Sequence, residues 1–219
     1  MTEAARFERK PDPKVLDPRR RAYWLKTLHQ WHWISSAMCL VALVLFSVTG
    51  FTLNHARQIE GKPTVSAREG QLPADLLARM ADGADRKDAP LPPPLREWIA
   101  RELGVEVGVR AAEWSDGEAY VSMPRPGGDA WLSVDLDSGK VQYEKTDRGW
   151  ISYFNDLHKG RNAGTLWSWF IDLFALASLV FALTGLFLLW LHGRQRPMTW
   201  PIVALGLLLP LLIALLFIH

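Results

Sequence analysis

The chain has 219 residues, a formal net charge of +2 and one cysteine, enough for one ordinary domain and a few membrane spans. The lone Cys39 excludes an internal disulfide, a thiolate metal cluster, a C-x-x-C redox motif and the C-x-x-C-H attachment of c-type haem. It lies in an apolar run, where we expect a small buried apolar residue. No H-E-x-x-H, G-x-S-x-G or P-loop motif supports hydrolytic chemistry.

Three apolar runs predict membrane-spanning helices at residues 33–53, 166–191 and 200–218. The first is about 21 residues long and crosses a hydrocarbon core of roughly 30 Å. It follows a polar segment and is too long for a signal core, so we expect an uncleaved anchor. Asp172 interrupts the second run. Pro210 interrupts the third, where neighbouring helices can satisfy the freed carbonyl.

The distribution of Lys and Arg predicts the orientation. We expect the basic segment 1–32 and the loop 192–199 to face the cytoplasm of a bacterium. The region 54–165, whose charges are balanced to slightly acidic, and His219 are then expected on the periplasmic side of the inner membrane. Membrane orientation explains the basic tail, so no nucleic-acid partner is expected. The cytoplasmic prediction rests on a set of basic residues: Arg6, Arg9, Lys10, Lys14, Arg19, Arg20, Arg21, Lys26, Arg194 and Arg196.

Region 54–165 predicts a small α+β domain, with helices first and an antiparallel sheet after them. Apolar residues recur at helical spacing at 72–80 and 95–103, which predicts a helix in each segment. A polar connector at 57–70 is expected before them. A period of two then predicts strands at 105–114, 119–123, 131–137 and 140–144. The sequence Asp-Ser-Gly-Lys at 137–140 indicates a hairpin turn.

The stretch L-S-V-D-L-D-S-G-K-V-Q-Y at 132–143 resembles the strand–turn–strand signature of PepSY domains. The segments L-H-Q-W-H-W-I-S-S (28–36), T-G-F-T-L-N-H-A (49–56) and D-L-H-K-G-R-N-A-G (156–164) resemble the PepSY-associated transmembrane family. The resemblance covers most of the chain after residue 25. With the three predicted spans, it implies an α-helical membrane protein with an extracytoplasmic α+β PepSY-like domain, in a family of which some members are haem-b reductases that release iron from siderophores. Those reductases are larger and usually have four spans.

Five histidines flank the first two spans, and none lies in mid-membrane. His29, His32 and His192 are predicted near the cytoplasmic face, and His55 and His158 near the outer face. Imidazole is a common axial ligand of haem iron, and helix bundles build such sites between facing helices. One or two bis-His haems b are therefore conceivable, with His32 favoured over His29. His32 and His55 are roughly 35 Å apart along a helix, a long path between two haems. The alternative role for each histidine is a hydrogen bond to a headgroup or a helix end.

The two spans carry a short repeat. F-S-V-T-G-F-T-L at 46–53 and F-A-L-T-G-L-F-L at 181–188 share Phe, Thr, Gly and Leu, and the helices run in opposite directions, which makes an inverted repeat. Gly50 and Gly185 would let a flat macrocycle approach the backbone, or only allow close helix packing.

Charged residues near these segments have candidate roles. Lys159 and Arg161 would pair with haem propionates or anchor the chain at the lipid surface. Asp172 is the charged residue inside a predicted span. It would handle a proton or have a structural role, or its carboxylate would simply reach water at the interface.

The function hypotheses follow from these features. The first is an inner-membrane haem-b electron carrier, passing electrons to a ferric chelate such as a siderophore in the periplasm, with no catalytic side chain assigned. The second is a non-enzymatic PepSY module that binds a periplasmic protein or serves as an assembly subunit. The third is a subunit of a flavin-linked chain, with any flavin on a partner. Three helices are few for enclosing a haem, so we expect a dimer or a partner subunit besides membrane lipid.

Overall fold

A computed structural model of the protein describes residues 17–59, 61–81, 88–193 and 196–218. Two compact units form. The helical unit comprises Met1–Leu43 and Asp172–His219, and the sheet unit comprises Val44–Ile171. Some residues behind the predicted orientation lie outside the described part: Arg6, Arg9, Lys10, Lys14, Arg194 and His219.

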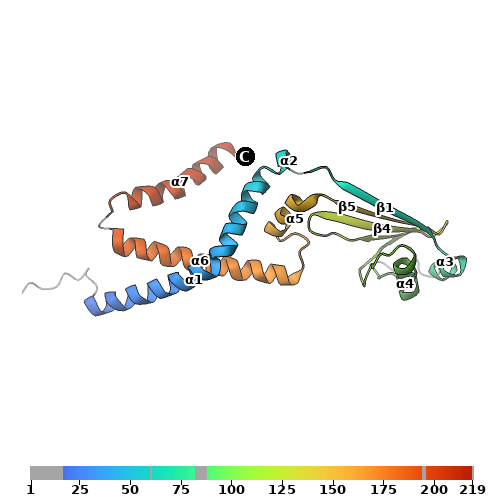
Figure 1. The fold of residues 1–219 in the computed structure, drawn as a ribbon, viewed down its shortest axis with the longest axis horizontal. Coiled ribbons are helices and arrows are strands. Elements are labelled where there is room, and N and C mark those ends of the chain that lie inside the picture. The colour runs from blue at the N-terminus through green and yellow to red at the C-terminus, as the bar shows by residue number, and fades with distance from the viewer. Residues whose placement is uncertain (1–16, 60, 82–87, 194–195, 219) are drawn as a thin grey trace, which may run out of the picture. The chain divides into compact units, whose positions relative to one another are not determined.

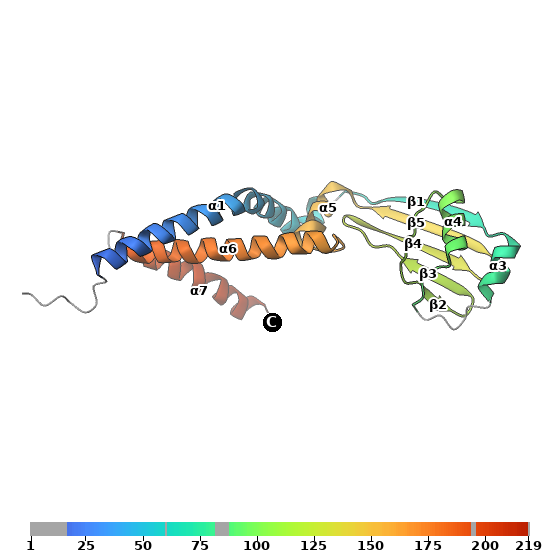
Figure 2. The same ribbon diagram turned by 90° about the horizontal axis from the view of Figure 1, so that it is seen from below.

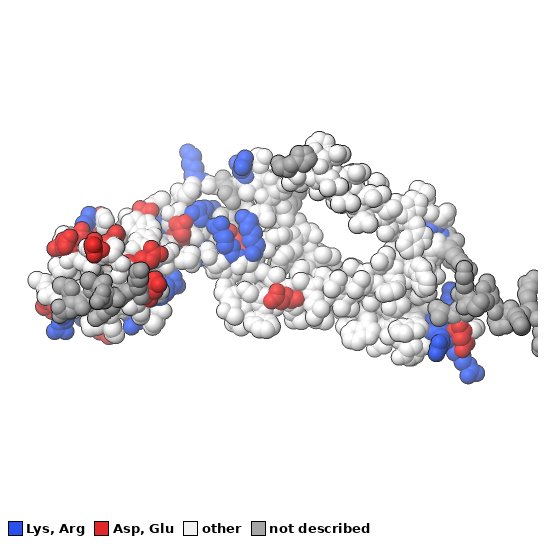
Figure 3. Space-filling model, turned by 180° about the vertical axis from the view of Figure 1, so that it is seen from behind, with Lys and Arg blue, Asp and Glu red and all other residues white. Residues whose placement is uncertain are grey.

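Within the described residues, three helices are long and apolar enough to cross a membrane: α1 (Pro18–Asn54), α6 (Thr165–His192) and α7 (Thr199–Phe217) (Figure 1). At 1.5 Å per residue they are about 55, 42 and 28 Å long. The predicted spans at 33–53 and 166–191 fall inside α1 and α6, and the span at 200–218 ends one residue beyond α7, with Pro210 within that helix as expected. On the face drawn in Figure 3, these helices show long uncharged stretches, interrupted by an acidic patch and by a charged cluster at one end.

Helix α1 begins at Pro18, well ahead of the predicted span, because its first turn is suited to a helix start. The Asp17 carboxylate accepts a hydrogen bond from the Arg19 N–H at 3.1 Å, and proline at the first position loses no helical hydrogen bond. In the helical unit Cys39 is 2% exposed, as predicted, and lies 3.6 Å from the Ser178 hydroxyl.

The sheet unit contains five antiparallel strands in the order β1-β5-β4-β3-β2 (Figure 2). Their bounds are Thr64–Gln71, Glu113–Ser115, Glu118–Ser122, Gly128–Asp135 and Lys140–Asp147 for β1 to β5. The predicted β4–β5 turn is confirmed. Gly139 has φ +71° there, and the Asp135 carboxylate accepts the N–H groups of Asp137 and Ser138 at 3.0 and 2.7 Å. These hydrogen bonds, that of Ser138 first, lower the pKa of Asp135.

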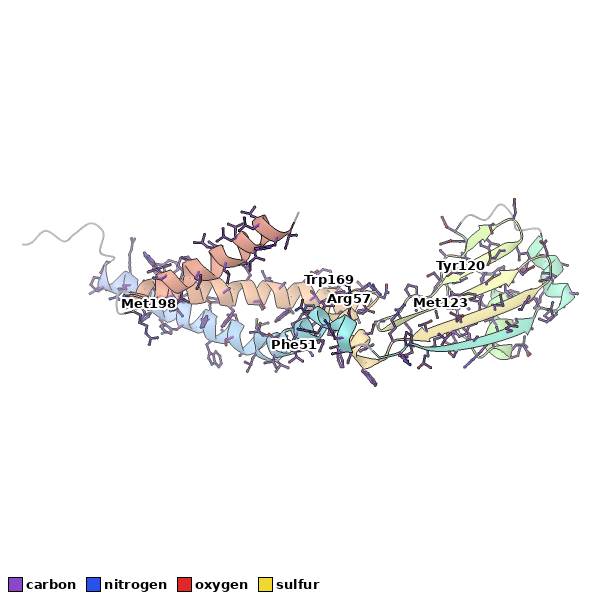
Figure 4. All side chains as sticks on the ribbon, turned by 90° about the horizontal axis from the view of Figure 1, so that it is seen from above. Phe51, Arg57, Tyr120, Met123, Trp169 and Met198 are labelled. Atoms are coloured by element: carbon purple, nitrogen blue, oxygen red, sulfur yellow. The ribbon has the colours of Figure 1, made fainter. Side chains whose placement is uncertain are left out.

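Buried and partly exposed residues alternate along β4, and the buried ones form part of the core. Every second residue of β4 is buried, from Gly128 to Val134. Helix α4 (Pro93–Glu102) covers this face of the sheet (Figures 1 and 2) with Leu95, Trp98 and Ile99, three side chains at helical spacing. Helix α3 (Ala74–Ala81) adds Met80. In Figure 4, Tyr120 on β3 and Met123 just after it mark the strand next to β4.

Three predictions in this region were wrong. Residues 57–70 are not a polar connector, since α2 (Ala56–Ile59) and most of β1 lie there. A strand therefore precedes the helices. Strand β1 lacks apolar alternation because it is an exposed edge strand, held by backbone pairing with β5. The predicted strand at 105–114 is regular only from Glu113, since Gly108 has φ +68°, outside the strand region.

One further helix escaped prediction. Helix α5 spans Gly149–His158, where no helix was expected. Its bounds matter because it ends on one of the candidate haem ligands and directly precedes α6.

Candidate functional site

In the helical unit His32 of α1 contacts three residues of α6: Phe181, Thr184 and Gly185. We call these four residues the His32 seat. The His32 ring stacks on Phe181 with centroids 4.6 Å apart. Its Nδ1 lies 3.0 Å from Thr184 Oγ1 and 3.2 Å from the Phe181 carbonyl oxygen. A Cβ atom at Gly185 would lie 3.2 Å from His32 Cε1. Only glycine therefore leaves the ring undisturbed.

The hydrogen bonds of this seat assign the tautomer of His32. Thr184 donates its hydroxyl hydrogen to the Val180 carbonyl oxygen at 2.7 Å, so its oxygen is free to accept. The Phe181 carbonyl can only accept. His32 Nδ1 is then the donor, and in the neutral imidazole this places the lone pair on Nε2. Holding one ring nitrogen while the other keeps its lone pair is the usual arrangement of a metal-binding histidine.

A cavity of about 440 Å³ adjoins the seat. It is lined by His32, Gly185, His192 and Arg196, with Leu188, Leu189, Gly193 and Thr199. This volume lies within the range of sites for cofactors and small ligands, 300–1,000 Å³. The predicted partners His32 and His192 therefore line one cavity.

His192 and His29 bond within their own helices, unlike His32, which bonds α6. His192 Nδ1 donates to the Leu188 carbonyl oxygen at 2.9 Å, so its Nε2 also keeps a lone pair. His29 Nδ1 donates to the Leu25 carbonyl oxygen at 2.7 Å, and its ring meets that of His192 edge-on, with centroids 6.1 Å apart. His29 is exposed and does not line the cavity.

The sheet unit contains a matching arrangement, which we call the His158 seat: His158 of α5 with Phe46, Thr49 and Gly50 of α1. His158 Nδ1 lies 2.7 Å from Thr49 Oγ1, and that hydroxyl donates to the Leu45 carbonyl oxygen at 2.8 Å. The Phe46 and His158 ring centroids are 5.0 Å apart. A Cβ atom at Gly50 would lie 3.4 Å from His158 Cε1.

The inverted repeat found in the sequence thus has a structural meaning. In each seat the Phe-x-x-Thr-Gly of one helix receives a histidine ring from another element. Phenylalanine packs against the ring, threonine bonds Nδ1, and glycine lies next to Cε1, where a Cβ atom would be tight at Gly185 and in ordinary contact at Gly50. The threonines and phenylalanines were not predicted as site residues, although their coincidence in the repeat was the signal that marks them.

The two seats differ in the space around them. The cavity at His158 measures only about 10 Å³, close to the minimum that holds one water. His55 Nδ1 donates to the Phe51 carbonyl oxygen at 3.0 Å, and its ring packs on Phe51. Among the described residues, no hydrogen bond or ring contact joins His55 to His158.

The charged candidates are placed as follows. Arg161 Nε lies 3.3 Å from the buried Asp156 carboxylate, so this cation already has a partner. Lys159 is exposed at the end of α5. Asp172 is exposed on α6. Arg196 was used in the sequence only for orientation, yet it is the arginine that lines the His32 cavity.

The comparison with known protein families decides the family. A family model described as PepSY_TM-like matches residues 23–219, which covers both seats, the sheet unit, most of α1 and all of α6 and α7. The chain belongs to the PepSY_TM-like family. No curated protein and no solved structure matches it.

Membership in the PepSY_TM-like family confirms the resemblance drawn from the histidine-bearing segments. With its three long apolar helices, it makes the chain a membrane protein that carries a small PepSY-like sheet domain.

Proposed function

We propose that this PepSY_TM-like protein is a haem-b electron carrier of the bacterial inner membrane. The observation that carries the proposal is the His32 seat. A histidine with Nδ1 held by Thr184 and Phe181 lines the same cavity as a second histidine, His192, whose Nδ1 is also held. Two neutral imidazoles with free Nε2 lone pairs are the donor set that a b-type haem requires.

The residues around this cavity fit a haem. Leu188 and Leu189 supply apolar walls, and Gly185 lines the cavity beside the His32 ring. Arg196 supplies a cation for a propionate carboxylate. A haem held there would supply one-electron transfer between ferric and ferrous iron. The protein's part would be to hold both imidazoles in one tautomer.

Electron transfer across the whole membrane would require a second haem site. The His158 seat offers the same phenylalanine, threonine and glycine around its histidine. A second haem there, with His55 as the predicted partner, would require the side chains around the 10 Å³ cavity to move apart. The support for the second haem is the matched chemistry alone.

The orientation and the acceptor complete the proposal. The described basic residues before the first apolar run, among them Arg19, Arg20 and Arg21, favour a cytoplasmic N-terminus. The sheet unit would then face the periplasm. Family membership and the resemblance to siderophore-iron reductases favour a ferric chelate as the electron acceptor.

A second function is favoured by one observation. Strand β1 is an open edge of the sheet, eight residues long and largely exposed. Such an edge accepts an added peptide strand through main-chain hydrogen bonds. The sheet unit could therefore act as a binding module for a periplasmic protein, with or without haem in the membrane.

Substitution of Thr184 tests how the His32 seat acts. We expect Thr184→Val to release haem roughly 10–100-fold more readily, since loss of a hydrogen bond to a metal-binding histidine weakens metal affinity by about that factor. The measurement is the rate at which haem passes from the purified protein to an excess of a haem-scavenging globin. Thr184→Ser keeps the hydroxyl and is the matched control. Equal haem loss from the valine variant and the wild type would exclude this role of Thr184.

A further inference from the structure

Helix α5 has the opposite polarity to a helix that faces water. Its buried residues are polar: Ser152, Asn155 and Asp156, each at most 6% exposed. Its outward face is aromatic, with Trp150 75% and Phe154 40% exposed. A helix on the surface of a water-soluble domain buries its apolar stripe and exposes its polar one. The reversed pattern indicates an apolar solvent on the outer side of α5.

Two oxygen-bearing groups on the polar face of α5 have partners in the protein, while Asn155 Nδ2 is buried without a hydrogen-bond partner among the described residues. Asn155 Oδ1 accepts a hydrogen bond from the Thr52 hydroxyl of α1 at 2.8 Å. The Asp156 carboxylate accepts the Gly127 N–H at 2.9 Å and faces Arg161. Burying an amide and a carboxylate is costly unless they are hydrogen-bonded or paired. These contacts therefore hold the polar face inward and the aromatic face outward.

The contacts of α5 also place it beside the spans. His158 bonds Thr49, more than a turn inside the end of α1. Phe154 lines the small cavity together with Leu45, which lies nine residues before Asn54, about 13 Å along the helix. At the other side the Trp167 Nε1–H of α6 donates to the Leu157 carbonyl oxygen at 2.8 Å. The carboxyl-terminal half of α5 is thus level with apolar turns of α1 and the start of α6.

We propose that α5 is a membrane-embedded helix, whose Trp150–Phe154 face is covered by lipid at the boundary between headgroups and acyl chains. Helices of this kind bury their apolar face about 5–10 Å into that boundary, and tryptophan is enriched there. Phe51 of α1 and Trp169 of α6, labelled in Figure 4, are likewise exposed on the adjoining spans. The parts of α1 and α6 in the same unit as α5 therefore also carry exposed aromatic side chains.

Site-specific labelling in lipid vesicles tests this proposal. Cys39 is the only cysteine, so a Cys39→Ala background allows single labels at Phe154→Cys and at Trp150→Cys. Val109→Cys is the control, because Val109 is an apolar residue of the same unit, 76% exposed and distant in sequence from α5. Each variant carries an environment-sensitive fluorophore in phosphatidylethanolamine–phosphatidylglycerol vesicles. Quenching is compared between nitroxide-labelled acyl chains and aqueous iodide.

We expect the label at 154 to be quenched by acyl-chain nitroxides several-fold more than the label at 109, and less by iodide. The label at 150 serves if the 154 variant does not fold, and should also favour the lipid quencher. Iodide quenching at 150 and 154 equal to that at 109 would overturn the proposal in favour of an aqueous surface. Protection from both quenchers would overturn it in favour of a second copy or a partner protein. Neither outcome depends on whether haem is bound.

Discussion

Replacing His32 with alanine is expected to remove the haem of the His32 seat, so that haem bound there falls to near background. Nothing else in the seat provides a nitrogen donor, since Phe181, Thr184 and Gly185 only position the ring. The measurement is haem per chain in detergent-purified protein, obtained by the pyridine haemochrome assay.

His29→Ala is the matched control for that variant. His29 lies one turn before His32 on the same helix, but it is exposed and bonds its own helix at Leu25. We expect this variant to keep the wild-type haem content. If His29→Ala lost haem and His32→Ala kept it, the assignment of the seat would be wrong.

Gly128→Ala is expected to destabilise the sheet unit at the upper end of the roughly 1–3 kcal/mol that overpacking costs. A Cβ atom there would lie 2.1 Å from the Thr146 carbonyl oxygen, which belongs to the backbone of β5 and cannot rotate away. The end of the β4–β5 ladder must then part, close to the loop residue Gly127 that bonds Asp156 of α5. Thermal unfolding of the full chain, followed by near-ultraviolet circular dichroism, measures the loss.

Gly61→Ala provides the comparison for this prediction. A Cβ atom at Gly61 would meet nothing within 4 Å, so its midpoint of unfolding should stay close to that of the wild type. Equal midpoints for Gly128→Ala and the wild type would show that β5 gives way at little cost.

The sequence predicted the parts of the protein whose physical requirements are local. A run of apolar residues long enough to cross a bilayer identifies a span without knowledge of its neighbours, and all three were found. The histidines near Gly50 and Gly185 were also found, because polar residues at the edges of apolar runs stand out. The threonine that bonds each histidine was not predictable. His32 and Thr184, for example, are far apart in the chain and meet only through helix packing.

The elements that were missed depend on tertiary contacts. Strand β1 has no alternating pattern, and it is ordered by pairing with β5. Helix α5 puts Asn155 and Asp156 inward and Trp150 outward, so a search for apolar positions on a buried face does not detect it. The same reversal, once seen in the structure, indicates the lipid environment of this helix.

The most direct test of haem binding is a reduced-minus-oxidised absorption spectrum of the detergent-purified protein, expressed with added haem precursor. We predict a b-type spectrum with at least one haem per chain. Two haems per chain would extend the assignment to the His158 seat. A colourless protein with no Soret absorption would contradict the account, and would leave the histidine seats as packing contacts and the sheet unit as a binding module.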